Sequence, residues 1–247
     1  MPQAIWTQAY EVNTLVLNHH RRLGLVGMLK LLQDAAWKHA EHLGHGYEAM
    51  LAQRTLWVLT RFALTMERWP AWGESIVIRT WVRPPVGALA QRDSEILIGD
   101  RKIGEATACW LTLHADTRRP LRLSLGEGAL AVREEGVLTL TPAKLALRPA
   151  LVEQSLVPVR LGDLDLNGHV SNVCYAQWML DALPEVEAVS AYEITFLGES
   201  RLGDTVRLEY DRDRPDQPWI QGLRSADGKP VFAARLTVSG AAAPHPA

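Results

Sequence analysis

The order of the expected secondary-structure elements repeats once along this chain of 247 residues. In residues 11–114 a short β-rich segment precedes a long helical pattern, which is followed by four strand-like segments. The same order returns in residues 156–240, at a spacing of about 145 residues. A duplicated plan of this kind predicts an α+β protein with two similar units, each with one helix packed on one antiparallel sheet.

Hydrophobic spacing supports each element of this plan. Within residues 23–44, apolar side chains recur at steps of three and four, as one face of a helix requires; they are Leu25, Met28, Leu29, Leu32, Ala36, Ala40 and Leu43. Segments rich in Val, Ile, Thr and Trp, separated by turn-forming residues, predict the strands: 11–18, 54–67, 74–85, 89–100 and 102–114, then 156–163, 189–200, 203–213, 218–227 and 230–240. A second helix is predicted within residues 170–183.

The segment between the two repeats is less periodic and contains Gly and Pro. We therefore expect an N-terminal domain over residues 1–123, a linker over 124–150 and a C-terminal domain over 151–240. Residues 241–247, with the sequence AAAPHPA, are expected to be a disordered tail.

Composition narrows the classes of function. The 26 basic and 28 acidic side chains nearly balance, so no net field would hold nucleic acid. Apolar runs are too short to span a bilayer, and the first residues lack the pattern of a secretory signal. Two cysteines, Cys109 and Cys174, fit a reducing compartment. The expectation is a cytoplasmic protein without nucleic-acid or membrane partners.

One stretch, DLDLNGHVSNVCYAQWMLDALP at residues 163–184, carries the candidate chemistry. Asp165, Asn167 and His169 stand at alternate positions, which on an extended backbone would point the same way. Ser171 is the expected N-cap of the following helix, whose free N–H groups would lie beside the imidazole. A carboxylate, an amide, a base and an oxyanion site are together what acyl hydrolysis needs.

The same stretch also has features of a plain turn and of a calcium loop. Asp-x-Asn-Gly is also good turn chemistry, and a plain turn remains open beside a catalytic site. A calcium loop is excluded by spacing, because the twelfth position counted from Asp163 is Cys174, where a bidentate Glu is needed.

The stretch DLDLNGHVSNVCYAQWML resembles the D-x-N-x-H-V-x-N-x-x-Y-x-x-W signature of the acyl-acyl carrier protein thioesterases. Further segments resemble the same family in the same order: residues 56–82, QRDSEI, IGEATACW, DTRRPLRL and EITFLGESRLGD. The resemblance implies two tandem hot-dog domains, each a long helix wrapped by an antiparallel sheet. It also implies hydrolysis of acyl-acyl carrier protein in fatty acid biosynthesis, with an acyl carrier protein as partner and no cofactor or metal.

Position by position, the resemblance implies Asp165, Asn167 and His169 as catalytic residues, with Glu199 as a further polar member. Ser200 stands where the plant enzymes have a Cys, so a cysteine–histidine mechanism is not expected here. The expected roles are attack or water activation by Asp165, orientation by Asn167, proton transfer by His169 and water binding by Glu199. Cys174 is expected to be a packing residue.

The resemblance also places the acyl-chain pocket in the N-terminal half. Most of the tryptophans there are expected in the core, with one or two lining the pocket; they are Trp37, Trp57, Trp72, Trp81 and Trp110. His39, His42 and His45 have the spacing of a metal site but lack accompanying ligands, so structural or surface roles are expected. Alignment of HHRRLG with LDLNGH by the repeat puts Arg22 and Gly24 where Asn167 and His169 stand, so the first half is expected to lack the catalytic set.

Other functions remain open at this point. Hot-dog folds also include hydrolases of acyl-CoA, dehydratases acting on 3-hydroxyacyl thioesters, and acyl-binding modules without activity. The D-x-N-x-H pattern does not suit a dehydratase, and the intact Asp165, Asn167 and His169 argue against a module without activity. A homodimer is an expected assembly, whereas acyl-chain length is left open.

Overall fold

A computed structural model of this protein describes residues 3–122, 131–149, 151, 153–183, 189–211 and 214–238. The chain divides into two compact units, residues 1–142 and 143–247, here called the N-terminal unit and the C-terminal unit. The expected linker, 124–150, is described only over 131–149, and the expected disordered tail, 241–247, lies outside the described residues.

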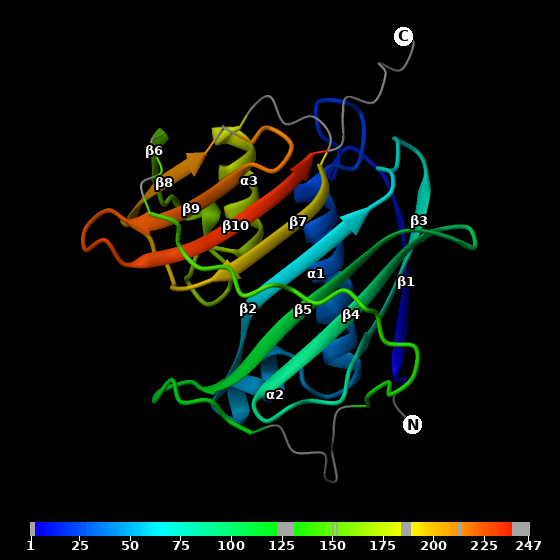
Figure 1. The fold of residues 1–247 in the computed structure, drawn as a ribbon. Helices are drawn as coiled ribbons and strands as arrows, with labels where there is room; N and C mark the ends of the chain where they lie inside the picture. The colour runs from blue at the N-terminus through cyan, green and yellow to red at the C-terminus, as the bar shows by residue number, and fades with distance from the viewer. Residues whose placement is uncertain are drawn as a thin grey trace. The chain divides into compact units, whose positions relative to one another are not determined.

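Each unit contains one long helix and a five-stranded antiparallel sheet (Figure 1). The N-terminal unit comprises β1 (Ile5–Glu11), α1 (Leu25–His42), α2 (Tyr47–Ala52), β2 (Thr55–Met66), β3 (Ser75–Val82), β4 (Leu89–Ile98) and β5 (Arg101–His114). The C-terminal unit comprises β6 (Glu153–Pro158), the 3-10 turn η1 (Leu161–Asp163), α3 (Asn172–Ala182), β7 (Val189–Phe196), β8 (Thr205–Asp211), β9 (Trp219–Arg224) and β10 (Pro230–Val238).

The two sheets have the same strand order. In the N-terminal unit it is β1-β3-β4-β5-β2, and in the C-terminal unit it is β6-β8-β9-β10-β7. Strands at corresponding positions along the two units therefore occupy corresponding positions in the two sheets. This confirms the α+β fold with two tandem hot-dog units, and the duplication that element order predicted.

The first strand lies earlier than expected. Residues 11–18 were predicted as a strand, but β1 ends at Glu11 and residues 14–16 form a turn. The side chains of Asn13 and Asn18 explain the difference, because Asn13 Oδ1 accepts the Leu15 N–H (3.0 Å) and Asn18 Oδ1 accepts the His20 N–H (3.0 Å). Such local side-chain bonds compete with strand pairing.

The buried face of α1 is also rotated from the expected one. Met28, Leu32 and Ala35 are buried as a stripe that continues to His39, whereas Ala36 and Ala40 are only half-buried. His39 is drawn into the interior by polar partners, since its Nδ1 lies 2.9 Å from Nη1 of Arg92 on β4. Apolar periodicity could not foresee a buried polar position.

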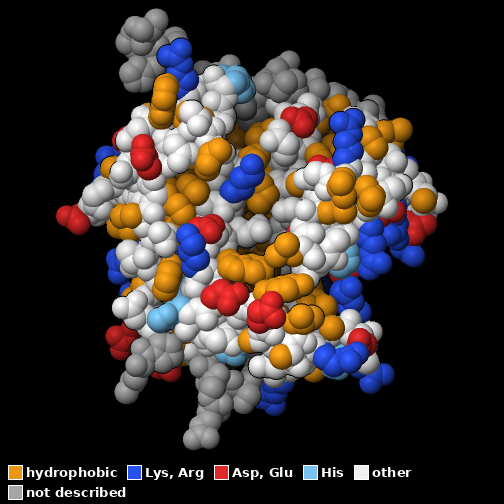
Figure 2. Space-filling model, turned by 180° about the vertical axis from the view of Figure 1, so that it is seen from behind, with side chains coloured by type: hydrophobic (Ala, Val, Ile, Leu, Met, Phe, Trp, Pro, Cys, Tyr) orange, Lys and Arg blue, Asp and Glu red, His pale blue; other side chains and the backbone are white. Residues whose placement is uncertain are grey.

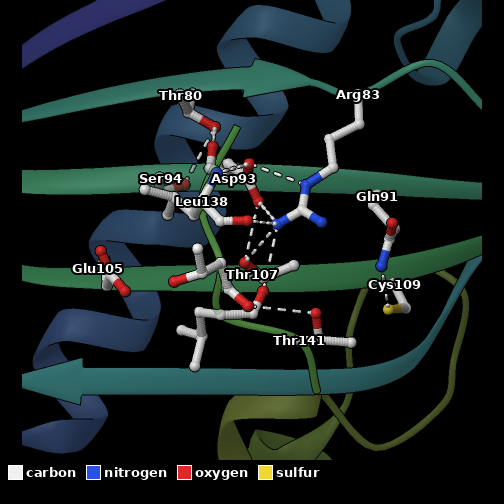
Figure 3. A network of polar contacts seen from close by, with 12 residues as sticks. Thr80, Arg83, Gln91, Asp93, Ser94, Glu105, Thr107, Cys109, Leu138 and Thr141 are labelled. Atoms are coloured by element: carbon white, nitrogen blue, oxygen red, sulfur yellow. Dashed lines mark hydrogen bonds and ion pairs between the residues drawn. The ribbon is translucent and has the colours of Figure 1, made fainter. Parts of the chain in front are cut away.

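The described part of the expected linker has no helix or strand, yet it is bound to both units by hydrogen bonds. In the N-terminal unit, Arg83 Nη2 donates to the carbonyls of Leu138 (2.8 Å) and Leu140 (3.2 Å). Figure 3 shows the bond to Leu138. In the C-terminal unit, the Leu145 N–H donates to Thr195 Oγ1 (2.9 Å), and Leu145 packs with Trp219 in a small apolar cluster.

Surface charge matches the composition. On the face drawn in Figure 2, basic and acidic side chains are interspersed with hydrophobic ones, as expected for 26 basic and 28 acidic residues. None of the described helices combines the length and the apolar character that crossing a bilayer requires.

Candidate functional site

The candidate catalytic residues begin on a tight turn between η1 and α3. The Asp165 N–H donates to the His169 carbonyl (2.7 Å), and the Gly168 N–H donates to the Asp165 carbonyl (3.0 Å). Gly168 has a φ of +72°, which a residue with a Cβ rarely adopts. The Asp165 carboxylate shapes the turn, because its Oδ1 accepts the N–H groups of Asn167 (2.8 Å) and His169 (3.2 Å).

The extended backbone expected from Asp165 as far as Gly168 is therefore wrong, although Gly168 does allow the chain to turn. The chain reverses at residues 165–168, and Leu164 pairs with Val170 across the turn in an isolated antiparallel bridge. Asn167 is exposed at the tip, while Asp165 and His169 are half-buried. The backbone of this stretch is thus a turn, as the plain-turn interpretation predicted. The turn places His169 next to a residue that is distant in sequence.

That partner is Glu199, which follows β7. His169 Nε2 lies 3.2 Å from Glu199 Oε2, and the two side chains are 18% and 39% exposed, so solvent reaches the pair. A bridge between His169 and Arg201 and a bond from the Val170 N–H to the Ser200 carbonyl (2.9 Å) hold the two segments side by side. The imidazole can thus exchange a proton beside a carboxylate that is open to water.

A buried layer close to this pair was not singled out by sequence reasoning. Tyr175 of α3 is 2% exposed, and its ring contacts Phe196 and Phe232 of the sheet. Burial raises the pKa of the Tyr175 hydroxyl, the nearby Ser200 hydroxyl opposes this rise, and the Glu199 and Asp165 carboxylates add to it. Both carboxylates therefore act on one phenol.

Ser200 is fully buried. Its hydroxyl lies beside Tyr175 in this buried layer, whereas Glu199, the preceding residue, is exposed. A nucleophile must reach the substrate carbonyl, so the burial of Ser200 favours packing over attack. Cys174 is half-buried on α3, with Sγ 3.5 Å from the Asp163 carbonyl.

The start of α3 follows the turn directly. Ser171 occupies the N-cap position, as predicted, but its side chain makes no capping hydrogen bond. Among the described residues, the N–H groups of Asn172 and Val173 have no acceptor. Two unpaired N–H groups at the positive end of an eleven-residue helix are suited to stabilise an oxyanion.

The N-terminal unit carries the same turn without the same side chains. The Asn18 N–H donates to the Arg22 carbonyl (2.9 Å), and the Arg21 N–H donates to the Asn18 carbonyl (3.1 Å). Asn18 Oδ1 accepts the N–H groups of His20 (3.0 Å) and Arg22 (3.2 Å), as Asp165 Oδ1 does in the C-terminal unit. Arg21, with a φ of +56°, takes the place of a glycine.

This hydrogen-bond pattern corrects the alignment of the repeat. Asn18 matches Asp165, His20 matches Asn167 and Arg22 matches His169, so the correspondence with Arg22 and Gly24 was wrong by two residues. The prediction that the first unit lacks the Asp, Asn and His set is confirmed by these equivalents.

Other candidate residues of the N-terminal unit take varied positions. Trp81 is fully buried, and Trp57 and Trp110 are half-buried. Trp37 and Trp72 are 44% and 62% exposed, so the core position expected for most of these tryptophans is wrong for these two.

The three spaced histidines lie in different environments. His39 is buried, His42 is exposed and His45 is half-buried. His39 is bound by the Gln3 carbonyl (3.1 Å from Nε2) and by Arg92. Within the part of the chain that the structure describes, no cluster of three or more His, Cys, Asp or Glu side chains could hold a metal ion.

Comparison with curated proteins yields plant relatives over most of the chain. An Arabidopsis thaliana protein described as oleoyl-acyl carrier protein thioesterase 2 is 27% identical over 227 residues, covering 84% of this chain and 59% of the relative. A Cinnamomum camphora protein described as dodecanoyl-[acyl-carrier-protein] hydrolase is 28% identical over 245 residues, covering 91% and 60%. The chain thus spans about 60% of the length of these relatives.

Solved structures share the fold over nearly the whole chain. A protein described as an acyl-ACP thioesterase from Bacteroides thetaiotaomicron superposes with a TM-score of 0.86 at 20% identity, covering 96% of this chain and 98% of that one. The 12:0-ACP thioesterase from Umbellularia californica gives a TM-score of 0.80 at 18% identity, covering 97% and 98%.

Family models match both halves of the sequence in order. Residues 3–125 match the acyl-ACP thioesterase N-terminal domain, and residues 149–217 match the C-terminal domain of the same family. The C-terminal match includes the turn, α3 and Glu199. Because both models match, each on the unit that holds the corresponding elements, the chain belongs to the acyl-ACP thioesterase family.

Proposed function

We propose that this protein hydrolyses acyl-acyl carrier protein to a free fatty acid and the carrier protein, in fatty acid biosynthesis. The observation that carries the proposal is the pair of His169 and Glu199, 3.2 Å apart, beside the turn that presents Asp165 and Asn167. Membership of the acyl-ACP thioesterase family and relatives with oleoyl and dodecanoyl in their descriptions support the same substrate class.

In the proposed mechanism, the Asp165 carboxylate attacks the thioester carbonyl or activates a water that does so, and Asn167 orients that carboxylate. Glu199, 39% exposed, holds the hydrolytic water, and His169 transfers a proton to the departing thiolate of the carrier's thiol group. The unpaired N–H groups of Asn172 and Val173 stabilise the oxyanion. The products are the carboxylic acid and the free thiol of the carrier.

The proposal also divides the work between the domains predicted from the sequence, 1–123 and 151–240. The acyl chain binds in the N-terminal domain, where α1 presents an apolar face to the sheet. The C-terminal domain, which has the complete Asp165, Asn167 and His169 set, cleaves the thioester. The proposal also includes a cytoplasmic location, assembly as a homodimer, and no need for a cofactor, nucleic acid or a membrane. Light scattering tests the assembly.

The test uses purified protein and a panel of thioesters on acyl carrier protein and on CoA, with release of free thiol as the measurement. Asp165→Ala, Asn167→Ala and His169→Ala are each expected to lower turnover at least ~100-fold, while circular dichroism shows a folded protein. Near wild-type rates in all three variants would remove the proposed site. Faster turnover of CoA thioesters than carrier thioesters would instead make the protein an acyl-CoA hydrolase.

Asp165→Asn is the matched variant for the turn. Asn18 makes the equivalent turn in the N-terminal unit with an amide oxygen, so an amide at position 165 should keep both backbone hydrogen bonds. An amide is neither a base nor a nucleophile at neutral pH, so activity should fall as far as in Asp165→Ala. If Asp165→Asn kept wild-type turnover, the carboxylate would have only a structural role.

A further inference from the structure

A buried cation lies on the face of the N-terminal sheet that α1 covers. Arg92 of β4 is 9% exposed, and its Nη1 is 2.9 Å from His39 Nδ1 on α1 and 3.3 Å from Thr80 Oγ1 on β3. The residues on either side of the guanidinium in the sheet are Val82 and Ala108, which offer it no acceptor. We call Arg92, His39, Thr80, Trp110 and Thr112 the Arg92 cluster.

The charge of Arg92 has no counter-ion in the described residues. Burial lowers the pKa of Arg92 to about 10, which still leaves the side chain cationic at neutral pH. Burial and the Arg92 charge lower the pKa of His39 to about 4, so the imidazole is neutral. On the opposite face of the same sheet, by contrast, the cation Arg83 has a counter-ion, because it pairs with Asp93 at 2.7 Å.

The free edge of the guanidinium can be identified from its bonds. His39 Nε2 lies 3.1 Å from the Gln3 carbonyl, an acceptor, so Nε2 carries the proton and Nδ1 accepts from Arg92. Both N–H groups of Arg92 Nη1 are used by His39 and Thr80. The N–H groups on Nε and Nη2 have no acceptor among the described residues, and this edge can take one carboxylate side-on through two parallel bonds.

Further unpaired donors share this face of the sheet. Arg92 lies opposite Ala108 of β5, so Trp110 and Thr112, two and four residues further along, point the same way. Trp110 Nε1 and Thr112 Oγ1 are buried without a hydrogen-bond partner in the described structure. An indole N–H can only donate, so the Arg92 cluster offers donors in excess of acceptors.

We propose that the Arg92 cluster is the polar end of the acyl-chain site and discriminates by the chemistry of the chain's far end. This inference rests on the proposed function. Methylenes pack on the apolar part of the same face, where Ile78 and Ile96 lie opposite each other and are fully buried. A methyl end that reaches Arg92 offers no acceptor to its free edge, whereas a carboxylate or hydroxyl end offers an oxygen that accepts from it.

The experiment compares acyl carrier protein thioesters of increasing length whose chains end in methyl, hydroxyl or carboxylate. For short chains, kcat/KM should depend little on the end group. At the length that reaches the cluster, the carboxylate-ended chain should be preferred at least about 10-fold over the methyl-ended one, with the hydroxyl-ended chain between them. Arg92→Met should bring this ratio close to one and extend the range of methyl-ended chains, while Arg92→Lys keeps part of the preference.

Trp110→Phe is the second variant, because it removes one donor and keeps an aromatic ring; it should lower the ratio less than Arg92→Met does. Trp72→Phe, at a position 62% exposed, is the control and should leave the ratio unchanged. If Arg92→Met does not fold, the ratios measured for Trp110→Phe and Arg92→Lys test the inference in its place. A ratio that does not vary with chain length, or one that the Arg92 and Trp110 variants leave unchanged, would overturn the inference.

A binding measurement separates this inference from the proposed function. Calorimetric titration with a free dicarboxylic acid and with the monocarboxylic acid of equal length should show the same preference in wild-type protein, and its loss in Arg92→Met. If no thioester is hydrolysed but this binding preference is found, the hydrolase proposal fails and the inference about the Arg92 cluster is supported. If short methyl-ended thioesters are hydrolysed but neither preference is found, the polar end fails alone.

Discussion

The buried pair of Arg83 and Asp93 provides the sharpest test of what stabilises the N-terminal unit. Asp93 is fully buried, and its carboxylate accepts four hydrogen bonds: from Arg83 Nε (2.9 Å) and Nη2 (2.7 Å), Thr107 Oγ1 (2.9 Å) and the Leu138 N–H (2.9 Å) (Figure 3). Arg83→Met removes the counter-charge and two of the four bonds but keeps the aliphatic stem. The carboxylate is then left buried with only Thr107 and Leu138.

Removing one partner of a buried ion pair costs about 3–5 kcal/mol, because the other charge stays desolvated. For a chain of this size, each kcal/mol lowers the unfolding midpoint by about 2–4 °C, so Arg83→Met should lower it by roughly 6–20 °C. The assay is thermal unfolding followed by circular dichroism. Limited proteolysis should also cut the segment 131–142 faster, because Arg83 donates to its carbonyls at Leu138 and Leu140.

The matched control is the pair of Arg68 and Glu74, which is also bidentate (2.9 and 2.8 Å) but is 41% and 32% exposed. An exposed pair contributes about 0–1 kcal/mol, so Arg68→Met should shift the midpoint by no more than a few degrees. A double change, Arg83→Met with Asp93→Leu, should recover part of the loss, because no charge remains buried. Equal shifts for Arg83→Met and Arg68→Met would refute the reasoning.

Three further predictions concern pH, the site and the acyl chain. Burial lowers the pKa of His39 from 6.5 to about 4, so between these pH values the unfolded state binds a proton at His39 and the folded state does not. The free energy of unfolding should therefore be highest above pH 6.5 and fall by up to about 3 kcal/mol by pH 4. Urea unfolding at several pH values measures this, and the same slope in His39→Gln would contradict it. Ser200→Ala should keep most thioesterase activity while Glu199→Ala loses much of it, because Ser200 is buried and Glu199 reaches His169; an acyl group trapped on Ser200 and found by mass spectrometry would reverse the assignment. Met28→Trp and Leu32→Trp, on the buried face of α1, should shorten the preferred acyl chain, since each buried methylene contributes ~0.8 kcal/mol; product profiles in which all chain lengths fall equally would put the acyl pocket elsewhere.

Periodicity predicted the fold because each unit has a simple pattern, an apolar helix face and strands with alternating burial. In β8, for example, Val206, Leu208 and Tyr210 are buried while the residues between them are half-buried. The pattern failed where polar groups are buried for specific partners, as at His39, or where a side chain captures the backbone, as at Asn18. Neither effect has a periodic signal in the sequence.

The candidate site was accessible to sequence reasoning only in part. The residue types at positions 165, 167 and 169 suggested acyl hydrolysis, but spacing could not bring Glu199 to His169, because they lie thirty residues apart in sequence and meet only where two loops pair. The family resemblance supplied Glu199. Tyr175 lay within the signature, yet its place near both carboxylates follows from the packing of its ring on Phe196 and Phe232.

The two turns, at Asn18 and Asp165, separate what the fold requires from what the chemistry requires. Both need a short side chain whose oxygen accepts two backbone N–H groups, and Asn and Asp satisfy this equally. Only Asp supplies a carboxylate, and only the C-terminal unit follows it with a His that faces a Glu. Residue identity therefore misaligned the repeat by two positions, whereas the hydrogen bonds align it. The turn is a structural element common to both units, on which only one unit carries the candidate catalytic groups.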